Sequence, residues 1–466
     1  MMKKHETKQA KISAIEITDE KLSGRGGLTL FIRFIENIGF YQFFEKYFSF
    51  AKRSSKGLSC RQFIMQLLAF FIDASDLSML GFDRRKNDAG YAGLLENTSA
   101  QMASSHQMKR FFENLGTVGN LIYRAILLRL FVWRLQIEKP SIIELFIDSV
   151  VWDNNDAGKR QGVEPTYKKV KGYQPLEISW GPYAVDAIFR SGSVHGNHDQ
   201  DVINAVSRLV RTIRKDYRDV PIIILSDSGF MDNDNFTYFE EQLHINYICS
   251  GKAYDDLKQY VQVIPKQRFK KLITAKQTWQ YIEFGNRLKS WSKFRRCIFT
   301  SMQTDEKGQL MFDFARPDSF IYTNIGLDPI LKKQLVDAGH DSYLKAKEII
   351  IADHQRGKSE LNHRSRKEFA GKETLPFEKM GMNRGYYYFM LMAHVLYEAY
   401  KHDVTFDVCP KESYPSTFRR TMIDFAVKLI SSGGRIVLKV TRAIYKQLRI
   451  KRLWKRIAAP KVLYQT

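Results

Sequence analysis

The sequence predicts an α/β protein: a catalytic core built on a mixed five-stranded sheet with helices, interrupted by a β-rich insertion. A helical N-terminal domain and a basic helical C-terminal segment flank this core. Three observations predict it: helical spacing of apolar residues before position 138, β-branched strands alternating with helices after it, and a final segment rich in Lys and Arg. The expected boundaries are 1–22 for a flexible arm, 23–138 for the helical domain, 139–253 and 343–408 for the two parts of the core, 254–342 for the insertion, and 409–466 for the basic segment.

The composition indicates an ordered protein with a polyanionic partner. Of the 466 residues, 44% are hydrophobic, and 73 Lys and Arg outnumber 50 Asp and Glu, which gives a net charge of +23. Such a surplus favours nucleic acid as the partner. An anionic membrane surface is the alternative, but the sequence contains neither an amphipathic N-terminal anchor nor a lipidation motif.

Sorting signals and cysteines predict the compartment. No apolar run reaches the roughly 18 residues of a membrane span, and no apolar segment follows the basic N-terminus as it does in a signal peptide. The four cysteines are far apart and form no C-x-x-C pair, which argues against a disulfide framework or a zinc site. We therefore expect a cytoplasmic, nucleoid-associated protein with no membrane partner.

The N-terminal domain is expected to be helical and to bind DNA. Short basic clusters, such as Arg84-Arg85-Lys86, are candidates for phosphate contacts, although paired basic residues are commonly plain solvated surface. The total charge favours the DNA contact. Helices are expected at 28–38, 60–72, after the N-cap Ser104, and at 121–135.

A carboxylate is associated with each of two buried strands. Residues 142–152 are dense in β-branched and aromatic side chains, as a central strand requires, and contain Asp148. A carboxylate there is costly unless it is paired or binds a metal. The alternative is a strand-end aspartate bonded to a neighbouring loop. The apolar strand 221–226 ends at Asp227, and open α/β sheets bind their ligands at the carboxyl ends of strands.

Further elements complete the predicted sheet. The chain order of three strands, helix, strand, helix and strand is that of an RNase H-like core. His195 and His198 lie near the cap of the first helix, and we expect them to be structural or to face phosphate, since no third histidine is available as a metal ligand. These elements are expected at 176–183, 184–189, from about 201, and at 235–243 and 246–252.

The insertion is expected to face a polyanion. Its segments alternate like short antiparallel strands and carry many basic and aromatic residues, among them Arg295 and Arg296. The strands are expected at 272–275, 278–284, 295–302 and 310–314.

A charged helix face supplies the remaining candidates for the site. Read at about 100° per residue, Asp353, Arg356, Glu360 and Lys367 fall within roughly 60° of arc. A carboxylate flanked by two cations suits an enzyme that holds a divalent metal beside phosphate. The alternative is a solvated, salt-bridged face. This helix is expected to run from about 343 through Glu360, and a second apolar helix at 386–400 would pack it against the sheet.

The chain is strongly basic after Pro410. Between Phe418 and Ile457, twelve Lys and Arg residues, beginning with Arg419 and Arg420, stand against one acid. Because apolar and aromatic residues are interleaved with them, the pattern predicts a helical element that lies on a phosphate backbone. A solvated helical tail is the alternative.

These motifs together resemble the DDE transposases of bacterial insertion sequences. The nearest group carries the signature Tyr-x2-Arg-x3-Glu-x6-Lys, and Arg356, Glu360 and Lys367 match it at the right spacing. The position of the signature tyrosine is occupied by Asp353, which adds a negative charge one helical turn from Arg356.

Other motifs extend the resemblance over nearly the whole chain, from about residue 22 to residue 456. Asp148, after isoleucine, and Asp227, in Asp-Ser-Gly-Phe, match the two family aspartates. Lys171 opens a Lys-Gly-Tyr-Gln-Pro loop that is similar to the family's Lys/Arg-Gly-Tyr-His-Pro. The downstream Leu-Pro-Phe at 375–377 also fits the type named after insertion sequence thirteen-eighty.

The resemblance implies a metal-dependent endonuclease and strand-transfer enzyme. Asp148, Asp227 and Glu360 would hold two Mg²⁺ or Mn²⁺ ions, and Arg356 and Lys367 would hold the phosphates flanking the element end. The enzyme would bind the terminal inverted repeats in double-stranded DNA, cleave the ends and join the 3′-hydroxyls to target DNA. Because both ends must be held together, we expect a homodimer bridged by DNA.

Two other classes of function stay open. An RNase H-like metal-dependent nuclease would share the three carboxylates but would not recognise element ends. A catalytically inactive, transposase-derived DNA-binding protein would keep the basic surface alone, and the three carboxylates argue against it. Strand joining separates the transposase from the nuclease.

Overall fold

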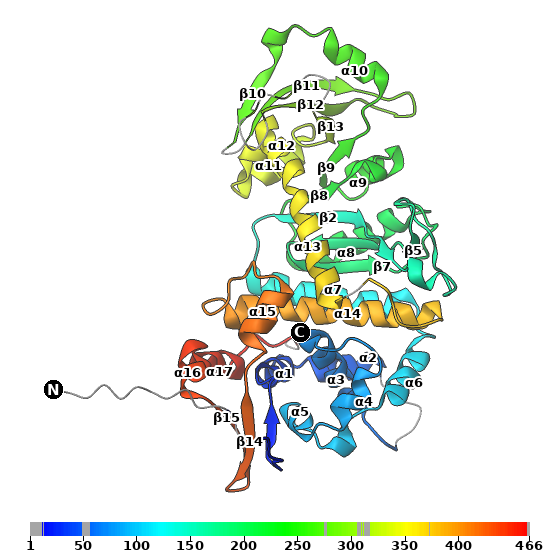
Figure 1. The fold of residues 1–466 in the computed structure, drawn as a ribbon. Helices are drawn as coiled ribbons and strands as arrows, with labels where there is room; N and C mark the ends of the chain where they lie inside the picture. The colour runs from blue at the N-terminus through cyan, green and yellow to red at the C-terminus, as the bar shows by residue number, and fades with distance from the viewer. Residues whose placement is uncertain are drawn as a thin grey trace, which may run out of the picture.

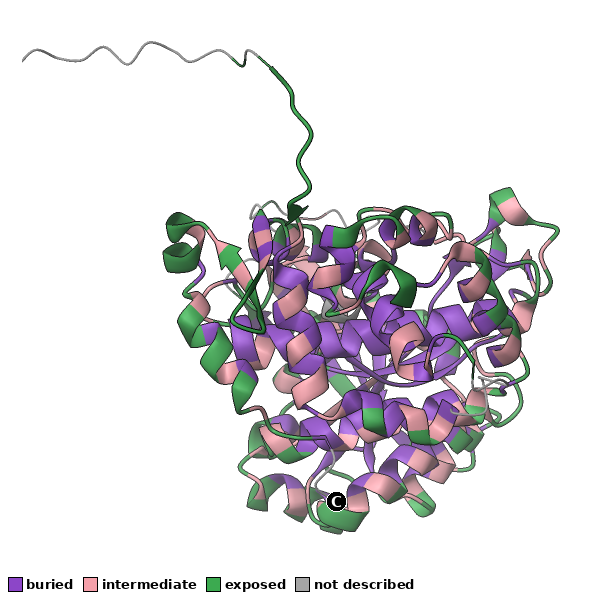
Figure 2. Cartoon of the chain, turned by 90° about the horizontal axis from the view of Figure 1, so that it is seen from below, coloured by how far each residue is buried: buried purple, intermediate pink, exposed green. Residues whose placement is uncertain are grey.

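The structure is a computed structural model of residues 1–466 (Figure 1). It describes residues 12, 14–48, 56–274, 277–304, 309, 311, 317–371 and 373–463, and for residues 357–360 it describes the backbone alone. Buried residues gather in the middle of the molecule, and exposed residues lie around it (Figure 2).

Among the described residues, nine strands form one large mixed sheet. The three central strands β2, β8 and β9 are parallel, and every other neighbouring pair is antiparallel. In spatial order the strands are β10 (Lys270–Ile273), β11 (Thr278–Asn286), β12 (Arg295–Thr304), β13 (Asp318–Thr323), β9 (Asn246–Gly251), β8 (Ile222–Ser226), β2 (Ile143–Ser149), β6 (Leu176–Trp180) and β7 (Tyr183–Ile188). The five strands expected between positions 142 and 252 are therefore found, and the parallel ones are the apolar runs that a sheet covered on both faces requires.

The β-rich insertion continues this sheet instead of forming a separate layer. Strand β13 pairs antiparallel with β9, and β12, β11 and β10 follow outward. This pairing covers the edge of β9, which would otherwise present unpaired backbone groups. The sequence analysis predicted no strand at the position of β13, and the strand expected at 310–314 lies outside the described residues except for residue 311.

Helix α14 (Met380–Tyr400) lies between the sheet and most of the N-terminal helices (Figure 1). It contacts β7, α3, α6 and α7, of which α7 also packs on β7, and its residues from Tyr386 to Tyr400 are all buried. A helix that is apolar on every side belongs in a core. The other helices of the N-terminal half are α1 (Gly27–Asn37), α2 (Phe40–Phe48), α3 (Cys60–Asp73), α4 (Gly81–Lys86), α5 (Ala89–Leu94), α6 (Ser105–Leu115), α7 (Asn120–Glu138) and α8 (Asp201–Asp216).

The sequence analysis predicted a helical C-terminal segment, but the structure shows that this segment is only partly helical. It contains a hairpin that pairs with residues of the expected flexible arm, because β14 lies between β15 and β1. The turn is Gly433-Gly434, both at positive φ, and a Gly-Gly pair between two β-branched runs is a hairpin signal that the basic pattern had masked. The segment comprises α15 (Pro415–Met422), β14 (Val427–Ser432), β15 (Arg435–Val440), α16 (Arg442–Gln447) and α17 (Ile450–Ala458), and β1 is Lys21–Ser23.

The two ends of the described chain are packed into one body. A Cβ on Gly27 would lie 1.8 Å from the carbonyl oxygen of Met422, so only glycine allows this close approach. The amide of Leu463 donates to the carbonyl of Ile38 at 2.8 Å, and the indole Nε1 of Trp133 donates to the carbonyl of Lys461 at 3.0 Å. The N-terminal helices and the C-terminal segment therefore share one hydrophobic core.

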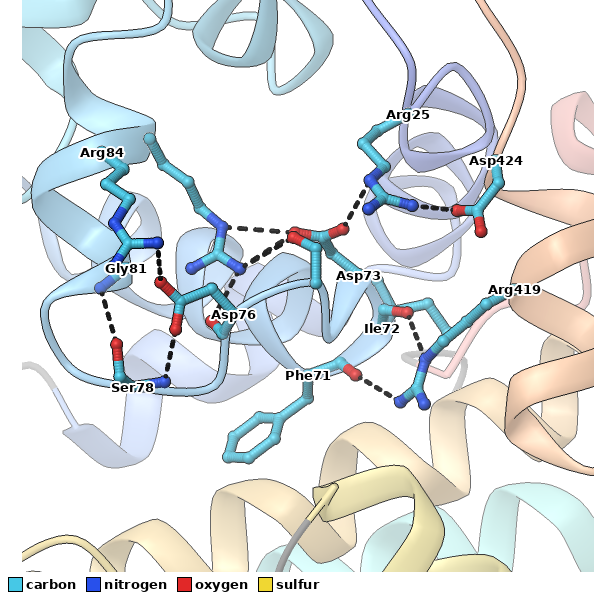
Figure 3. A network of polar contacts seen from close by, with 12 residues as sticks. Arg25, Phe71, Ile72, Asp73, Asp76, Ser78, Gly81, Arg84, Arg419 and Asp424 are labelled. Carbon is cyan, nitrogen blue, oxygen red and sulfur yellow. Dashed lines mark hydrogen bonds and ion pairs between the residues drawn. The ribbon is translucent and has the colours of Figure 1, made fainter.

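A buried ionic network fixes this junction (Figure 3). The carboxylate of Asp73 is fully buried and pairs with Arg25 at 3.1 Å and with Arg85 at 3.0 Å. Arg25 also pairs with Asp424 of the C-terminal segment. Arg419 donates to the carbonyls of residues 71 and 72 at 3.0 Å each, where α3 ends and its carbonyls lack helical partners.

All four cysteines are free and buried. In the described part of the chain, no single helix is long and apolar enough to cross a membrane; only the stretches Ser99–Leu115 and Asn120–Glu138 pass such a test together, with a 99° bend between them.

Candidate active site

A cleft of about 1150 Å³ opens beside the carboxyl ends of β2 and β8. It brings together side chains that the sequence had singled out from three distant regions. Its walls come from the loop after β2, from the edge of the insertion, and from the helices α12 (Ala346–Gln355) and α13 (Gly357–Ala370). The charged residues among its lining are Asp148, Lys168, Asp227, Asp318, Asp353, Arg356, Arg364, Lys367, Glu368 and Glu373.

Asp148 and Asp227 lie side by side because their strands are neighbours. In the parallel register, Ile147 is paired with Ser226, and each aspartate is the next residue of its strand. The carboxylate of Asp227 accepts a hydrogen bond from the amide of Gly229 at 2.8 Å. Burial raises the pKa of Asp227, and the negative charge of Asp148 raises it further against the opposing effect of Arg356. The two carboxylates thus repel each other, and a bound cation would relieve that repulsion.

Asp353 is a further carboxylate in the wall of the cleft. Its side chain is 7% exposed and accepts a hydrogen bond from Oγ of Ser250 at 2.7 Å. Burial raises its pKa, while Ser250 and then the charge of Arg356 act to lower it. The aspartate at the signature position is therefore held by the neighbouring strand β9.

The charged helix expected from 343 through Glu360 is two helices. Helix α12 ends at Gln355 and α13 begins at Gly357, so Arg356 lies at the junction. Arg356 and Lys367 both line the cleft, and Nζ of Lys367 pairs with Glu373 at 2.8 Å. Glu360 lies in the first turn of α13, but its side chain lies outside the described residues, and its predicted role as the third metal ligand stays a prediction.

Behind Asp148, a buried network that the sequence analysis missed joins β6 to α13. His363 Nε2 lies 3.1 Å from Asp148 Oδ2, and His363 Nδ1 lies 3.5 Å from Glu177 Oε2. Arg366 pairs with the same Glu177 oxygen at 3.1 Å, and the hydroxyl of Tyr387 donates to the other at 2.6 Å. One signal could have found it: Glu177 is a carboxylate in an apolar strand, the same signal that identified Asp148, and it lies directly opposite Asp148 in the sheet.

The network is strongly charged. Burial alone would raise the pKa of Glu177, but the charge of Arg366, followed by His363 and Tyr387, lowers it to about 2. Burial and Arg366 oppose protonation of His363, yet hydrogen bonds to Asp148 and Glu177 outweigh them and raise its pKa. The carboxylate of Asp148 is thus held from behind by a histidine that is itself fixed between Glu177 and Arg366.

Two predicted phosphate contacts in the insertion are engaged elsewhere. Arg295 is 1% exposed, pairs with Glu240 at 3.0 Å and lies over the rings of Trp291 and Phe236. Because it lies in the core and does not line the cleft, the structure does not support its assignment as a DNA contact, which stays a prediction. Arg296 pairs with Glu283 at 2.7 Å and donates to two backbone carbonyls, of residues 325 and 344.

Three further candidates lie away from the cleft lining. Lys171 is exposed at the start of β5 (Lys171–Tyr173), which forms a small sheet with β3 (Trp152–Asp153) and β4 (Glu164–Pro165); Lys168 of the same loop lines the cleft instead. Arg419 is committed to the carbonyls at the end of α3, whereas Arg420 is exposed. His195 and His198 do not line the cleft either.

Among the described side chains, no group of three or more His, Cys, Asp or Glu residues is arranged to hold a metal ion. The carboxylate of Glu360 is not among those side chains. The two aspartates that lie together offer only oxygen ligands, which suit Mg²⁺ or Mn²⁺ and not zinc or copper.

Comparison with known proteins identifies a family whose model matches this chain. The family model described as "Transposase DDE domain group 1" matches residues 5–462. No curated protein matches the sequence. Among solved structures, a chain of the "Cryo-EM structure of piggyBac transposase synaptic complex with hairpin DNA" is similar, with 12% identity and a TM-score of 0.37 over 94% of this chain and 83% of that chain. A likeness at that TM-score carries no weight beside the family model, which spans nearly the whole chain.

Proposed function

Because this chain belongs to the transposase DDE domain group 1 family, we propose that it is the transposase of an insertion sequence. It would bind the terminal inverted repeats of its element, cleave the DNA ends and join the 3′-hydroxyls to target DNA. The core that carries this chemistry would be RNase H-like. Two protomers bridged by DNA would hold the two ends, since both ends must react in one complex.

The pair formed by Asp148 and Asp227 carries this proposal. The two carboxylates come from neighbouring parallel strands and line one cleft with Arg356 and Lys367. Burial of Asp227 and the negative charge of Asp148 together raise the pKa of Asp227. Carboxylates whose charges repel in a polar cleft are found where function requires them, since nothing in folding favours the arrangement.

The chain's own donors fit divalent ions, which the family generally uses. Asp148 and Asp227, with Glu360 from the first turn of α13, would hold two Mg²⁺ or Mn²⁺ ions. When bound, such ions activate a water or a 3′-hydroxyl and stabilise the leaving oxygen of a phosphodiester.

The remaining residues of the cleft would bind and orient the DNA. Arg356 and Lys367 would hold the phosphates beside the scissile bond; Lys367 would exchange its pair with Glu373 for a phosphate oxygen. His363 would keep the carboxylate of Asp148 in one orientation through its contact with Oδ2, while the amide of Ser149 donates to Oδ1 at 2.7 Å.

Cleavage of a labelled duplex that carries the flanking end of the element tests this proposal. We expect Mg²⁺-dependent cleavage at the 3′ end by the wild type, and none above background by Asp227→Asn. Asp216→Asn, at the exposed end of α8, is the matched control and should cleave like the wild type. Equal cleavage by Asp227→Asn would rule out the proposed site.

One observation favours a second candidate, a catalytically inactive DNA-binding derivative. Asp353 occupies the signature tyrosine position and adds a carboxylate to the cleft where the signature has a tyrosine. Specific binding of the element end without cleavage by the wild type would support this candidate. Cleavage without any strand joining would instead indicate an RNase H-like nuclease.

A further inference from the structure

The basic residues at the end of the chain greatly outnumber the acidic residues that could pair with them. From Arg435 to Ala458 the sequence contains nine Lys and Arg residues and no Asp or Glu. Three of them, Arg449, Arg452 and Arg456, converge on the single carboxylate of Asp407, at distances that include 3.3 Å for Arg449 and 2.7 Å for Arg452. Hydrogen bonds from these arginines, first from Arg456, hold the pKa of Asp407 far below its usual range. A single carboxylate therefore forms ion pairs with three arginines.

Six further cations of this stretch form no ion pair with an acidic residue in the described part of the chain. Among the described residues, no ion pair is formed by Arg435, Lys439, Arg442, Lys446, Lys451 or Lys455. By contrast, prominent arginines of the N-terminal helices are paired, as Arg33 is with Glu96 and Arg124 with Asp186. A cluster of unpaired like charges is self-repulsive, and an anionic partner relieves that repulsion.

Three of these six cations, together with two of the arginines that pair with Asp407, line a hollow in the surface. A depression of about 650 Å³ lies against α16 and α17 and is lined by Tyr445, Lys446, Arg449, Lys451, Arg452 and Lys455, with no acidic side chain in its wall. The hollow has a rigid floor, because Leu453 and Ile457 of α17 are buried against α1, and the carbonyl of Ile457 accepts a hydrogen bond from Asn37 at 2.8 Å.

Exposed aromatic and apolar side chains are interleaved with the charges. Trp454 is 49% exposed and Tyr445 is 44% exposed. On the outer edge strand β15, Arg435, Val437 and Lys439 point to one face by alternation, and all three are exposed. Aromatic rings beside cations in an exposed surface are typical of nucleic-acid contacts and unusual for a face that only meets water.

We propose that this terminal basic surface, formed by β15, α16 and α17, binds the phosphate backbone of double-stranded DNA independently of its sequence. The surface shares no residue with the catalytic cleft, and in Figure 1 it lies below α14 and α15, on the other side from β2, β8 and α12. The lining of the hollow consists of lysines, arginines and one tyrosine, side chains that contact phosphate oxygens, and contacts to phosphate position a protein on the duplex without reading its bases. The inference rests on the proposed function only in that the partner is DNA.

Binding of a fluorescent 30-base-pair duplex of random sequence, measured by anisotropy in EDTA, tests this inference without catalysis. The variant Lys446→Ala/Lys451→Ala/Lys455→Ala removes three exposed charges from the hollow. Because each phosphate contact contributes about 0.9 to the slope of log K against log salt, the slope should fall by about 2 to 3 and affinity by roughly tenfold or more. The matched control, Arg211→Ala/Lys215→Ala/Arg218→Ala, removes three exposed charges on and after α8 and should bind within about twofold of the wild type.

The binding and cleavage experiments have separate outcomes. The anisotropy assay runs in EDTA and measures binding alone, so loss of cleavage by Asp227→Asn leaves the inference intact, and a failed inference leaves the proposed active site intact. An unchanged affinity and salt slope in the hollow variant would overturn the inference. Preferential binding of the wild type to phosphatidylserine vesicles or to single-stranded RNA, with weak duplex binding, would overturn it too.

Discussion

Glu177 allows the buried network behind the active site to be tested by a single change. Its side chain is 1% exposed, and among the described residues it is the one carboxylate within ion-pair distance of Arg366, whose side chain is also 1% exposed. The substitution Glu177→Gln preserves the shape but leaves Arg366 without its counter-charge and leaves Asp148 as the only carboxylate beside His363 among the described residues. Breaking a buried pair in this way costs about 3–5 kcal/mol, because an uncompensated charge stays in the core.

The pKa of Glu177 gives an independent magnitude. Its fall from 4.5 to about 2 corresponds to roughly 3 kcal/mol, at about 1.4 kcal/mol per pKa unit. Because the folded-state pKa is depressed, this stabilisation is present above pH 4.5 and is lost as the pH falls toward 2. The wild type should therefore lose stability in that window, and Glu177→Gln should lack this part of the pH dependence.

Equilibrium unfolding in urea at pH 7 is the assay, and Glu283→Gln is its control. Glu283 also pairs with an arginine, Arg296, but its side chain is 36% exposed, so its loss should cost less than about 1 kcal/mol. We expect Glu177→Gln to lose about 3 kcal/mol. A loss no larger than that of the control would refute the inference that this buried network stabilises the fold.

Two other predictions concern neighbouring residues. His363→Ala should weaken Mn²⁺ binding, measured by electron paramagnetic resonance, roughly tenfold or more while the protein stays folded, because residues that orient a ligand carry effects of that size; unchanged Mn²⁺ affinity would show that His363 does not position Asp148. Arg295→Ala should destabilise the fold by about 3 kcal/mol, since it leaves Glu240 without its buried partner, yet leave duplex affinity within about twofold in the anisotropy assay; a selective loss of DNA binding would return Arg295 to the DNA contacts.

The sequence was most informative where a charged side chain occurs in an element whose other residues are apolar and expected to be buried. Asp148 stood out because a carboxylate in a β-branched strand requires a reason, and Asp227 because it ends an apolar strand. The structure brings both to one cleft, together with Arg356 and Lys367. Glu177 carried the same signal in its strand and went unrecognised.

The remaining features depend on partners far away in the chain. Arg295 looked like a surface cation, but Glu240, 55 residues earlier, and two aromatic rings bury it. The hairpin β14–β15 exists as part of a sheet because β1, about 400 residues away, pairs with it. The break between α12 and α13 falls at Gly357, which helical periodicity alone does not register.

Strand joining tests the central claim most directly. A pre-cleaved duplex with a free 3′-hydroxyl at the element end is incubated with a supercoiled plasmid and Mg²⁺, and joined products are counted. We expect joined products for the wild type and none for Asp227→Asn or in EDTA. Joining by Asp227→Asn at the wild-type level would contradict the assignment of the site, and cleavage by the wild type without joining would contradict the assignment as a transposase.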